Sequence, residues 1–206
     1  MNNKLVITIG REFGSGGREI ARKVAEKLNI KMYDKELISL ISKNSGMCED
    51  VVREFDETAV NSFLYALSTG SFAGASVMST TQSLSINDKA FINCSQTIKD
   101  LADNESCVIV GRCAESILKG RENLLSVFIY ADLEQRIKRV CEHENITADS
   151  AESVIKRADK KRASYHNYYS DTRWGARNAY DLCINSKIGI DIAADIIVKA
   201  ALALEK

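Results

Sequence analysis

The chain has 206 residues, of which 45% are hydrophobic and 27% charged, as in an ordinary globular domain. Its 28 basic and 28 acidic residues balance, which argues against bulk binding of nucleic acid or of an anionic membrane surface. No run approaches the roughly 20 apolar residues of a membrane span and no signal peptide is visible, so we expect a single cytoplasmic domain with neither kind of partner.

The first predicted elements are a strand, a glycine-rich loop and a helix. Residues 5–9 form a continuous run of mostly branched apolar side chains, typical of a strand buried on both faces. Glycines follow at positions 10, 14, 16 and 17, and apolar residues at helical spacing then extend to Leu28. A loop that opens a helix in this way directs backbone N–H groups at one point, so the segment predicts a phosphate site.

The rest of the chain alternates predicted strands with predicted helices. Further strands are expected at 30–33, 106–110, 125–131 and 181–185. Helices are expected at 88–103, 113–119, about 148–168 and roughly 190–204. Two more are expected, one after Asp34 with Leu37, Ile38 and Ile41, and one after Asp132 with Ile137, Val140 and Cys141. This alternation indicates βαβ units, so we expect an α/β fold in three layers, with a parallel, roughly five-stranded sheet flanked by helices.

Ligands of such a sheet bind beyond the carboxyl ends of its strands. The glycine loop, Asp34, Gly111, Arg112 and Asp132 all follow predicted strands and are expected along that edge. Asp34 also lies where a cap of the next helix is expected. Arg112 can bind a phosphate through two parallel hydrogen bonds, or it can pair with a nearby carboxylate.

Residues 44–86 depart from the alternation. A short helix is expected at about 48–55, and residues 68–85 are rich in Ser, Thr, Gly and Ala, a composition that buries little surface. Two interpretations stay open: a loop insertion without a role, or a segment that closes over a substrate.

The loop lacks two side chains of the standard phosphate-binding signature, which ends in Gly-Lys-Ser/Thr. Here the corresponding residues are Gly16-Gly17-Arg18-Glu19. We therefore interpret Gly10, Gly14, Ser15, Gly16 and Gly17 as the phosphate cradle.

Neighbouring charged residues are candidates for the missing functions. Arg11 or Arg18 can replace the lysine, and Glu12 and Glu19 are candidate Mg²⁺ ligands. A dinucleotide-binding loop is the competing interpretation, but it requires a third, spaced glycine that this loop lacks.

Arginines and lysines gather in the second half of the chain. They include Arg136, Arg139, Lys156, Arg157, Lys160, Lys161, Arg162, Arg173 and Arg177. Phosphoryl transfer depends on positive charge around the moving group, which such a segment can supply. A solvated helix face, with Asp159 and Arg162 as a local ion pair, is the alternative.

The six cysteines are scattered without a Cys-x-x-Cys pair, as expected of reduced thiols. His143 and His166 belong to no metal-spaced motif, and we interpret them as surface or packing residues.

Several segments together resemble the cytidylate kinase-like family, a divergent branch of the P-loop nucleoside monophosphate kinases. The resemblance extends over nearly the whole chain and rests on residues 7–21, 33–36, 108–114, 127–131, 159–162 and 180–182. It implies a P-loop kinase-like fold with an acceptor-binding insertion at 44–86 and a helical lid at about 142–175.

The resemblance also implies an activity and residue roles. It implies an enzyme that transfers a phosphoryl group from ATP, with Mg²⁺, to CMP, dCMP or a related small phosphorylated substrate. Arg157 and Arg162 resemble the catalytic arginines of the lid, beside Arg18 in the loop, while Arg112 and Asp34 fall at acceptor-binding positions. Because the loop lacks the usual lysine and hydroxyl, a nucleotide-binding module without kinase activity is the alternative.

Overall fold

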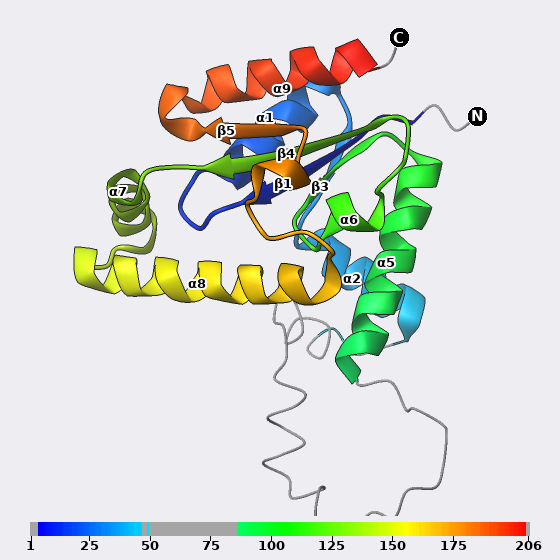
Figure 1. Cartoon of the computed structure of the whole chain (residues 1–206), viewed down its shortest axis with the longest axis horizontal. Coiled ribbons are helices and arrows are strands. Elements are labelled where there is room, and N and C mark those ends of the chain that lie inside the picture. Colours follow the sequence, from blue (N-terminus) through cyan, green and yellow to red (C-terminus); the bar gives the residue numbers. More distant parts are fainter. Residues whose placement is uncertain (1–3, 47–48, 50–85, 205–206) are drawn as a thin grey trace, which may run out of the picture.

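Five parallel strands form one sheet in the order β2-β3-β1-β4-β5 (Figure 1). The computed structural model describes residues 4–46, 49 and 86–204. The strands are β1 (Val6–Arg11), β2 (Lys31–Tyr33), β3 (Cys107–Val110), β4 (Leu124–Tyr130) and β5 (Leu182–Asn185). All six residues of β1 are buried, because β3 and β4 pair with it on either side.

Helices cover both faces of the sheet (Figure 1). One face carries α1 (Gly17–Leu28) and α9 (Ile190–Leu204). The other carries α2 (Glu36–Ser45), α5 (Ile86–Asn104) and α6 (Ala114–Ile117). The long helix α8 (Ala148–Tyr169) follows α7 (Leu133–Glu144), and the two pack on each other beside the carboxyl ends of the strands.

The central strand divides the core in two. Ile7 and Ile9 point toward α1 and α9, whereas Val6 packs with α2 and α5. This alternation follows from the two-residue period of a strand. A third apolar cluster joins α7 and α8 through Val140 and Ile155, and Phe13 of the glycine loop packs against it.

The predicted three-layer α/β fold with five parallel strands is confirmed. The expected helix at about 48–55 and most of the predicted insertion at 44–86 lie outside the described residues. One local prediction is wrong: Lys35, not Asp34, is the N-cap of α2, and no side chain caps that helix. Within the described residues, no helix is long and apolar enough to cross a membrane.

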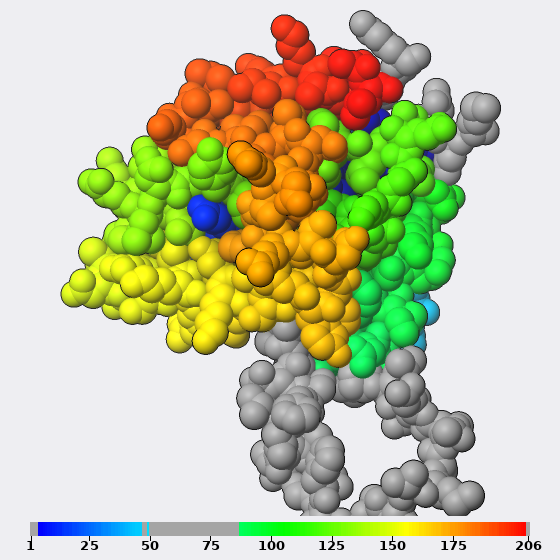
Figure 2. Space-filling view, in the orientation of Figure 1, coloured from blue at the N-terminus to red at the C-terminus, as the bar shows by residue number. Residues whose placement is uncertain are grey.

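In the space-filling view, the orange segment between α8 and β5 lies across the front of the molecule (Figure 2). Blue atoms from the start of the chain reach the surface between this segment and α7. The loop that follows β1 is therefore partly exposed at the carboxyl edge of the sheet, where ligands of such folds bind.

Candidate functional site

The glycine loop connects the central strand β1 to α1 at the carboxyl edge of the sheet. Its backbone is left-handed at Gly14 (φ 76°) and Gly16 (φ 81°), a conformation that favours glycine. Neither position has room for a side chain, since a Cβ on Gly14 would lie 2.9 Å from Val140 and one on Gly16 would lie 2.6 Å from Ile190. Helix α1 begins after Gly16 without a side-chain cap, which suits its N-terminus to an anion.

The side chain of Arg11 packs on Gly17. A Cβ atom added to Gly17 would lie 2.6 Å from Cβ and 3.1 Å from Cγ of Arg11. Gly17 is the seventh residue of the standard signature, where lysine belongs, and Arg11 is the first, where glycine belongs. The cation and the glycine have therefore exchanged positions in this loop.

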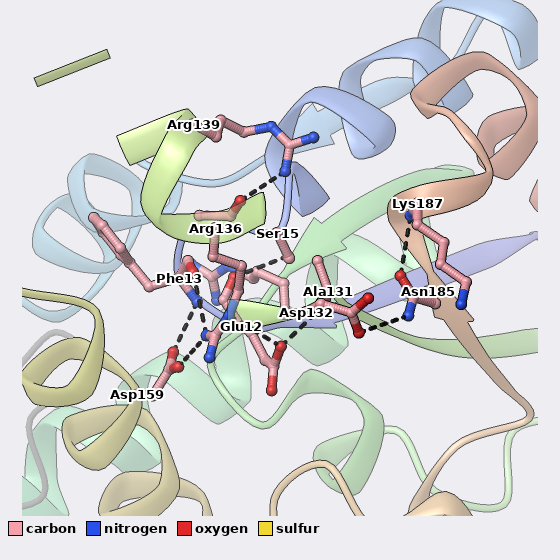
Figure 3. Close-up of polar contacts among 12 residues, drawn as sticks. Glu12, Phe13, Ser15, Ala131, Asp132, Arg136, Arg139, Asp159, Asn185 and Lys187 are labelled. Atoms are coloured by element: carbon pink, nitrogen blue, oxygen red, sulfur yellow. Dashed lines mark hydrogen bonds and ion pairs between the residues drawn. The ribbon is translucent and has the colours of Figure 1, made fainter. Parts of the chain in front are cut away.

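Arginines from α7 and α8 hold the loop from outside, and Figure 3 shows the two from α7, Arg136 and Arg139. They donate hydrogen bonds to three loop carbonyl oxygens: Arg136 to Phe13 (3.3 Å), Arg139 to Gly14 (2.7 Å) and Arg162 to Arg11 (3.2 Å). Each bond fixes the orientation of a peptide unit in the loop. The guanidinium of Arg162 also lies over the Phe13 ring, 5.5 Å from its centroid.

Two carboxylates complete this brace (Figure 3). Asp159 accepts a hydrogen bond from the Phe13 N–H (2.7 Å) and from Arg136 (2.5 Å). Glu12 accepts the N–H of Ala131 at 3.1 Å and lies 3.5 Å from Nε of Arg136. Burial raises the pKa of Glu12, while the Ala131 hydrogen bond and the Arg136 charge act in the opposite direction.

A cleft of about 700 Å³, which we call the loop cleft, opens beside this loop. Its lining residues include Arg11, Glu12, Gly14, Gly16, Gly17, Arg18, Glu19, Arg22, Arg139 and Arg162. The fold thus brings most of the predicted phosphate-binding residues to one cleft, and five arginines give it a positive lining.

A second, much smaller cavity lies between the ends of β1 and β3. This arginine cavity has a volume of about 20 Å³, and Arg11, Arg112 and Arg162 line it together with Glu115 and His166. Because Arg11 and Arg162 also line the loop cleft, the two spaces share a cationic wall.

An unusual turn places Arg112 in this cavity. Three successive residues, Gly111, Arg112 and Cys113, have left-handed φ angles of 75°, 60° and 56°. Such conformations are strained for residues other than glycine and concentrate at functional sites. The turn buries Arg112, of which 5% is exposed, at the carboxyl edge of the sheet.

Other predicted residues are engaged differently from what the sequence suggests. Arg18 forms an ion pair with the buried Asp34 (2.5 Å), which links α1 to the end of β2. The Ser15 hydroxyl donates to the Glu12 carbonyl oxygen (2.9 Å) and so braces the loop. Gly10 belongs to β1, and a Cβ there would lie 2.9 Å from the Phe128 ring.

The two predicted lid arginines lie on different faces of α8. Five residues separate Arg157 from Arg162, which corresponds to about 140° around a helix. Arg162 lines both spaces, whereas Arg157 is exposed and lines neither.

The residues of the loop cleft suit a magnesium ion that enters with a nucleotide. In the described part of the chain, no group of three or more His, Cys, Asp or Glu side chains can hold a metal ion by itself. Mg²⁺ in phosphate sites usually needs only one or two carboxylates, because substrate oxygens and waters supply the other ligands. Glu12 and Glu19 line the cleft and can fill that role.

The structure adds functional candidates that the sequence interpretation missed. Glu115 was not singled out, and His166 was interpreted as a surface or packing residue, yet both line the arginine cavity. A signal was present for His166: it follows Arg162 by four residues, which places both on the same face of a helix.

Comparison with known proteins agrees with this architecture. The sequence profile of the cytidylate kinase-like family matches residues 6–188. An uncharacterized protein from Eubacterium ventriosum ATCC 27560 is 33% identical, with a TM-score of 0.73 over 97% of this chain and 99% of that chain. No match was found among curated proteins.

Shikimate kinases share the fold at much lower identity. The enzyme from Bacteroides thetaiotaomicron is 15% identical, with a TM-score of 0.51 over 97% of both chains. The enzyme from Acinetobacter baumannii, solved in complex with shikimate, is 14% identical, with a TM-score of 0.50 over 98% of this chain and 94% of that chain. These structures support the fold alone.

Proposed function

The chain belongs to the cytidylate kinase-like family, and on that basis we propose that it transfers the γ-phosphoryl group of ATP to a nucleoside monophosphate such as CMP or dCMP, or to a related small molecule. One observation carries the proposal. The stem of Arg11 packs on Gly17 and Arg11 lines the loop cleft, so an arginine of the same segment can supply the charge that the standard signature takes from its lysine.

Arg11 and Arg162 both place positive charge beside the phosphoryl group that is transferred. Both line the loop cleft, where the phosphates of ATP bind at the N-terminus of α1, and both line the arginine cavity on the acceptor side. Positive groups fixed between donor and acceptor stabilise the charge that develops during transfer. Arg112 lines the acceptor side alone.

Mg²⁺ enters with ATP in this proposal and neutralises phosphate charge. Glu12 and Glu19 are its candidate protein ligands. Arg18 acts through its ion pair with Asp34, which fixes the end of β2 at the acceptor side. Arg157 and a lid at about 142–175 remain predictions from the resemblance.

The experiment that tests the proposal is a coupled ADP-release assay with Mg²⁺ and ATP. CMP, dCMP, UMP and AMP are offered in turn as acceptors, and the phosphorylated products are identified by mass spectrometry. We expect turnover with at least one acceptor, above the rate without acceptor. Absence of turnover with every acceptor would overturn the kinase proposal.

A nucleotide-binding module without kinase activity is the second candidate, because Gly17 and Glu19 replace the usual lysine and hydroxyl. It predicts that ATP raises the melting temperature, as any ligand of the native state does, without phosphoryl transfer. A thermal-shift series with ATP, ADP and CMP, with and without Mg²⁺, separates the two candidates when it is combined with the assay.

A further inference from the structure

Glu115 and His166 form a buried pair behind the arginine cavity. Nε2 of His166, on α8, lies 2.8 Å from a carboxylate oxygen of Glu115, on α6. Only 3% of His166 and 7% of Glu115 is exposed. Both residues line the cavity together with Arg11, Arg112 and Arg162.

The other ring nitrogen of His166 is buried without a hydrogen-bond partner among the described residues. Because the carboxylate of Glu115 accepts a hydrogen bond, Nε2 carries the proton of the neutral ring and Nδ1 keeps its lone pair. A buried acceptor without a donor is unfavourable. The adjacent cavity, at about 20 Å³, holds about one water-sized group, which can supply the donor.

The lining of the cavity combines three arginines with one carboxylate, that of Glu115. The remaining titratable residues that line it are Cys113, Tyr165 and Tyr180. Burial raises the pKa of both tyrosines, so each stays protonated at neutral pH. The three arginines supply the positive charge, and the Glu115 carboxylate orients the imidazole.

Within the proposed function, on which this inference rests, we propose that the acceptor is an alcohol and that His166 takes the proton from its hydroxyl group. A phosphate acceptor is already ionised and needs no base, whereas an alcohol does. The acceptor oxygen forms a bond to the γ-phosphorus of ATP, and the bond from that phosphorus to the β–γ bridging oxygen breaks. Its electron pair leaves with ADP, and the hydroxyl proton moves to Nδ1.

Water is the simplest hydroxyl acceptor, so ATP hydrolysis tests the proposal without knowledge of the natural acceptor. Phosphate release is measured with the full chain, Mg²⁺ and ATP, for the wild type, His166→Gln and Glu115→Gln. Thr172→Val is the matched control. Its hydroxyl lies 2.9 Å from that of Ser170, so this substitution also removes a polar contact just after α8, but Thr172 does not line the cavity.

We expect His166→Gln to lower kcat by about 10²- to 10⁴-fold, the usual contribution of a general base, with little change in KM for ATP. Glu115→Gln lowers kcat less, because the imidazole remains, and Thr172→Val keeps the wild-type rate. Melting temperatures of all variants show whether each is folded. A folded His166→Gln protein with wild-type kcat would overturn the role of His166.

A second experiment tests the acceptor class with matched pairs of compounds. The assay compares cytidine with CMP, uridine with UMP, and adenosine with AMP. Shikimate and glycerol are added as alcohols that carry no nucleobase. We expect transfer to at least one of the alcohols, and we expect His166→Gln to slow that transfer as it slows ATP hydrolysis.

The two proposals fail in different ways. Transfer to CMP or another monophosphate but to none of the alcohols would overturn this inference and leave the proposed function in place. A wild-type protein whose melting temperature does not respond to ATP would overturn the proposed function itself.

Discussion

Arg11 and Gly17 act as a pair of residues rather than as two separate departures from a signature. The arginine stem needs the space over position 17, and a glycine there leaves that space open. In the standard signature the first residue is glycine and the seventh is lysine. There the side chain between these two positions belongs to the seventh residue instead of the first. The loop therefore depends on the combination of the two residues.

Substitutions at these two positions test that combination. We expect Arg11→Ala to weaken ATP binding, and Gly17→Ala to do so as well, because the new Cβ would displace Arg11. The double variant Arg11→Gly with Gly17→Lys restores the standard order and is expected to bind ATP better than either single variant. Isothermal titration with ATP and Mg²⁺ measures the three affinities.

A double variant that binds ATP no better than either single variant would contradict the exchange of roles. Lys35→Ala, on an exposed residue at the start of α2, is the control for a general effect of removing positive charge.

The partly buried carboxyl group of Glu12 makes the stability of the protein depend on pH. Its raised pKa means that the folded protein binds this proton more tightly than the unfolded chain. Its contribution to stability is therefore present below the unfolded carboxyl pKa of about 4.3 and lost as pH rises through the folded value. We expect Glu12→Gln, which cannot ionise, to gain stability relative to the wild type as pH rises from about 4 to 7.

Calorimetric melting temperatures at several pH values check this sign. Glu134→Gln, on an exposed residue of α7, serves as the control. A difference between Glu12→Gln and the wild type that shrinks as pH rises would contradict the burial argument.

At the scale of elements, α7 and α8 act as a brace for the glycine loop. Three arginine side chains from these helices bind loop carbonyls, and Asp159 binds a loop N–H. The apolar cluster around Val140 and Ile155 holds the two helices together beneath Phe13. We therefore expect binding of a nucleotide in the loop to be coupled to the position of α8.

Two arginines on α8 allow a matched test of this coupling. We expect Arg162→Ala to lower kcat by about 10²-fold or more, as expected when a charge beside the transferring phosphoryl group is lost, with a modest loss of stability. Arg157→Ala removes an equal charge from the exposed face of the same helix and should leave kcat near wild type. Steady-state kinetics with melting curves separate the two effects.

Equal losses of activity and of folding in Arg162→Ala would instead identify a residue that only packs the helix. A strong loss in Arg157→Ala would show that this side chain reaches the phosphates when a nucleotide binds.

The elements were predictable from sequence to a greater degree than the contacts between them. Buried runs such as residues 106–110 and 125–131 carry their own strand signal, because a strand between two helix layers is apolar on both faces. The loop glycines were equally visible. Which carboxylate Arg18 or Arg136 would bind depends on elements far apart in the chain, and no local pattern encodes that choice.

The residues that line the loop cleft were therefore predicted largely from the sequence, but the contacts that each of them makes were not. Gly14, Gly16, Arg11 and Arg162 do gather in one cleft. The pair of Glu115 and His166 was missed, because each residue alone has an ordinary sequence context.

At the scale of the whole molecule, α1 joins the phosphate site to the core. Its buried face packs on α9 around Ile20 and Ile197, both fully buried. Two surface ion pairs, Lys23 with Asp191 (2.7 Å) and Lys27 with Asp195 (2.8 Å), join the same helices. The apolar contact is expected to dominate, because exposed ion pairs contribute little and are screened by salt.

This ranking is tested by comparing Ile197→Ala with the double variant Lys23→Ala, Lys27→Ala. Truncating a fully buried isoleucine typically costs about 2–5 kcal/mol, through lost burial and the cavity that it leaves. We expect the lysine variant to stay close to wild type in urea denaturation and to approach it further as salt is added. A larger loss in the lysine variant than in Ile197→Ala would contradict the ranking.

The exchange between Arg11 and Gly17 also affects how such loops are identified in genomes. A pattern that requires lysine directly after the last glycine rejects this chain, although the stem of Arg11 packs on Gly17 at the start of the same helix. A pattern of arginine, any four residues and two glycines describes a loop whose cationic side chain is at the first position and whose seventh position is glycine. We expect a search with this second pattern to find further loops of the same arrangement.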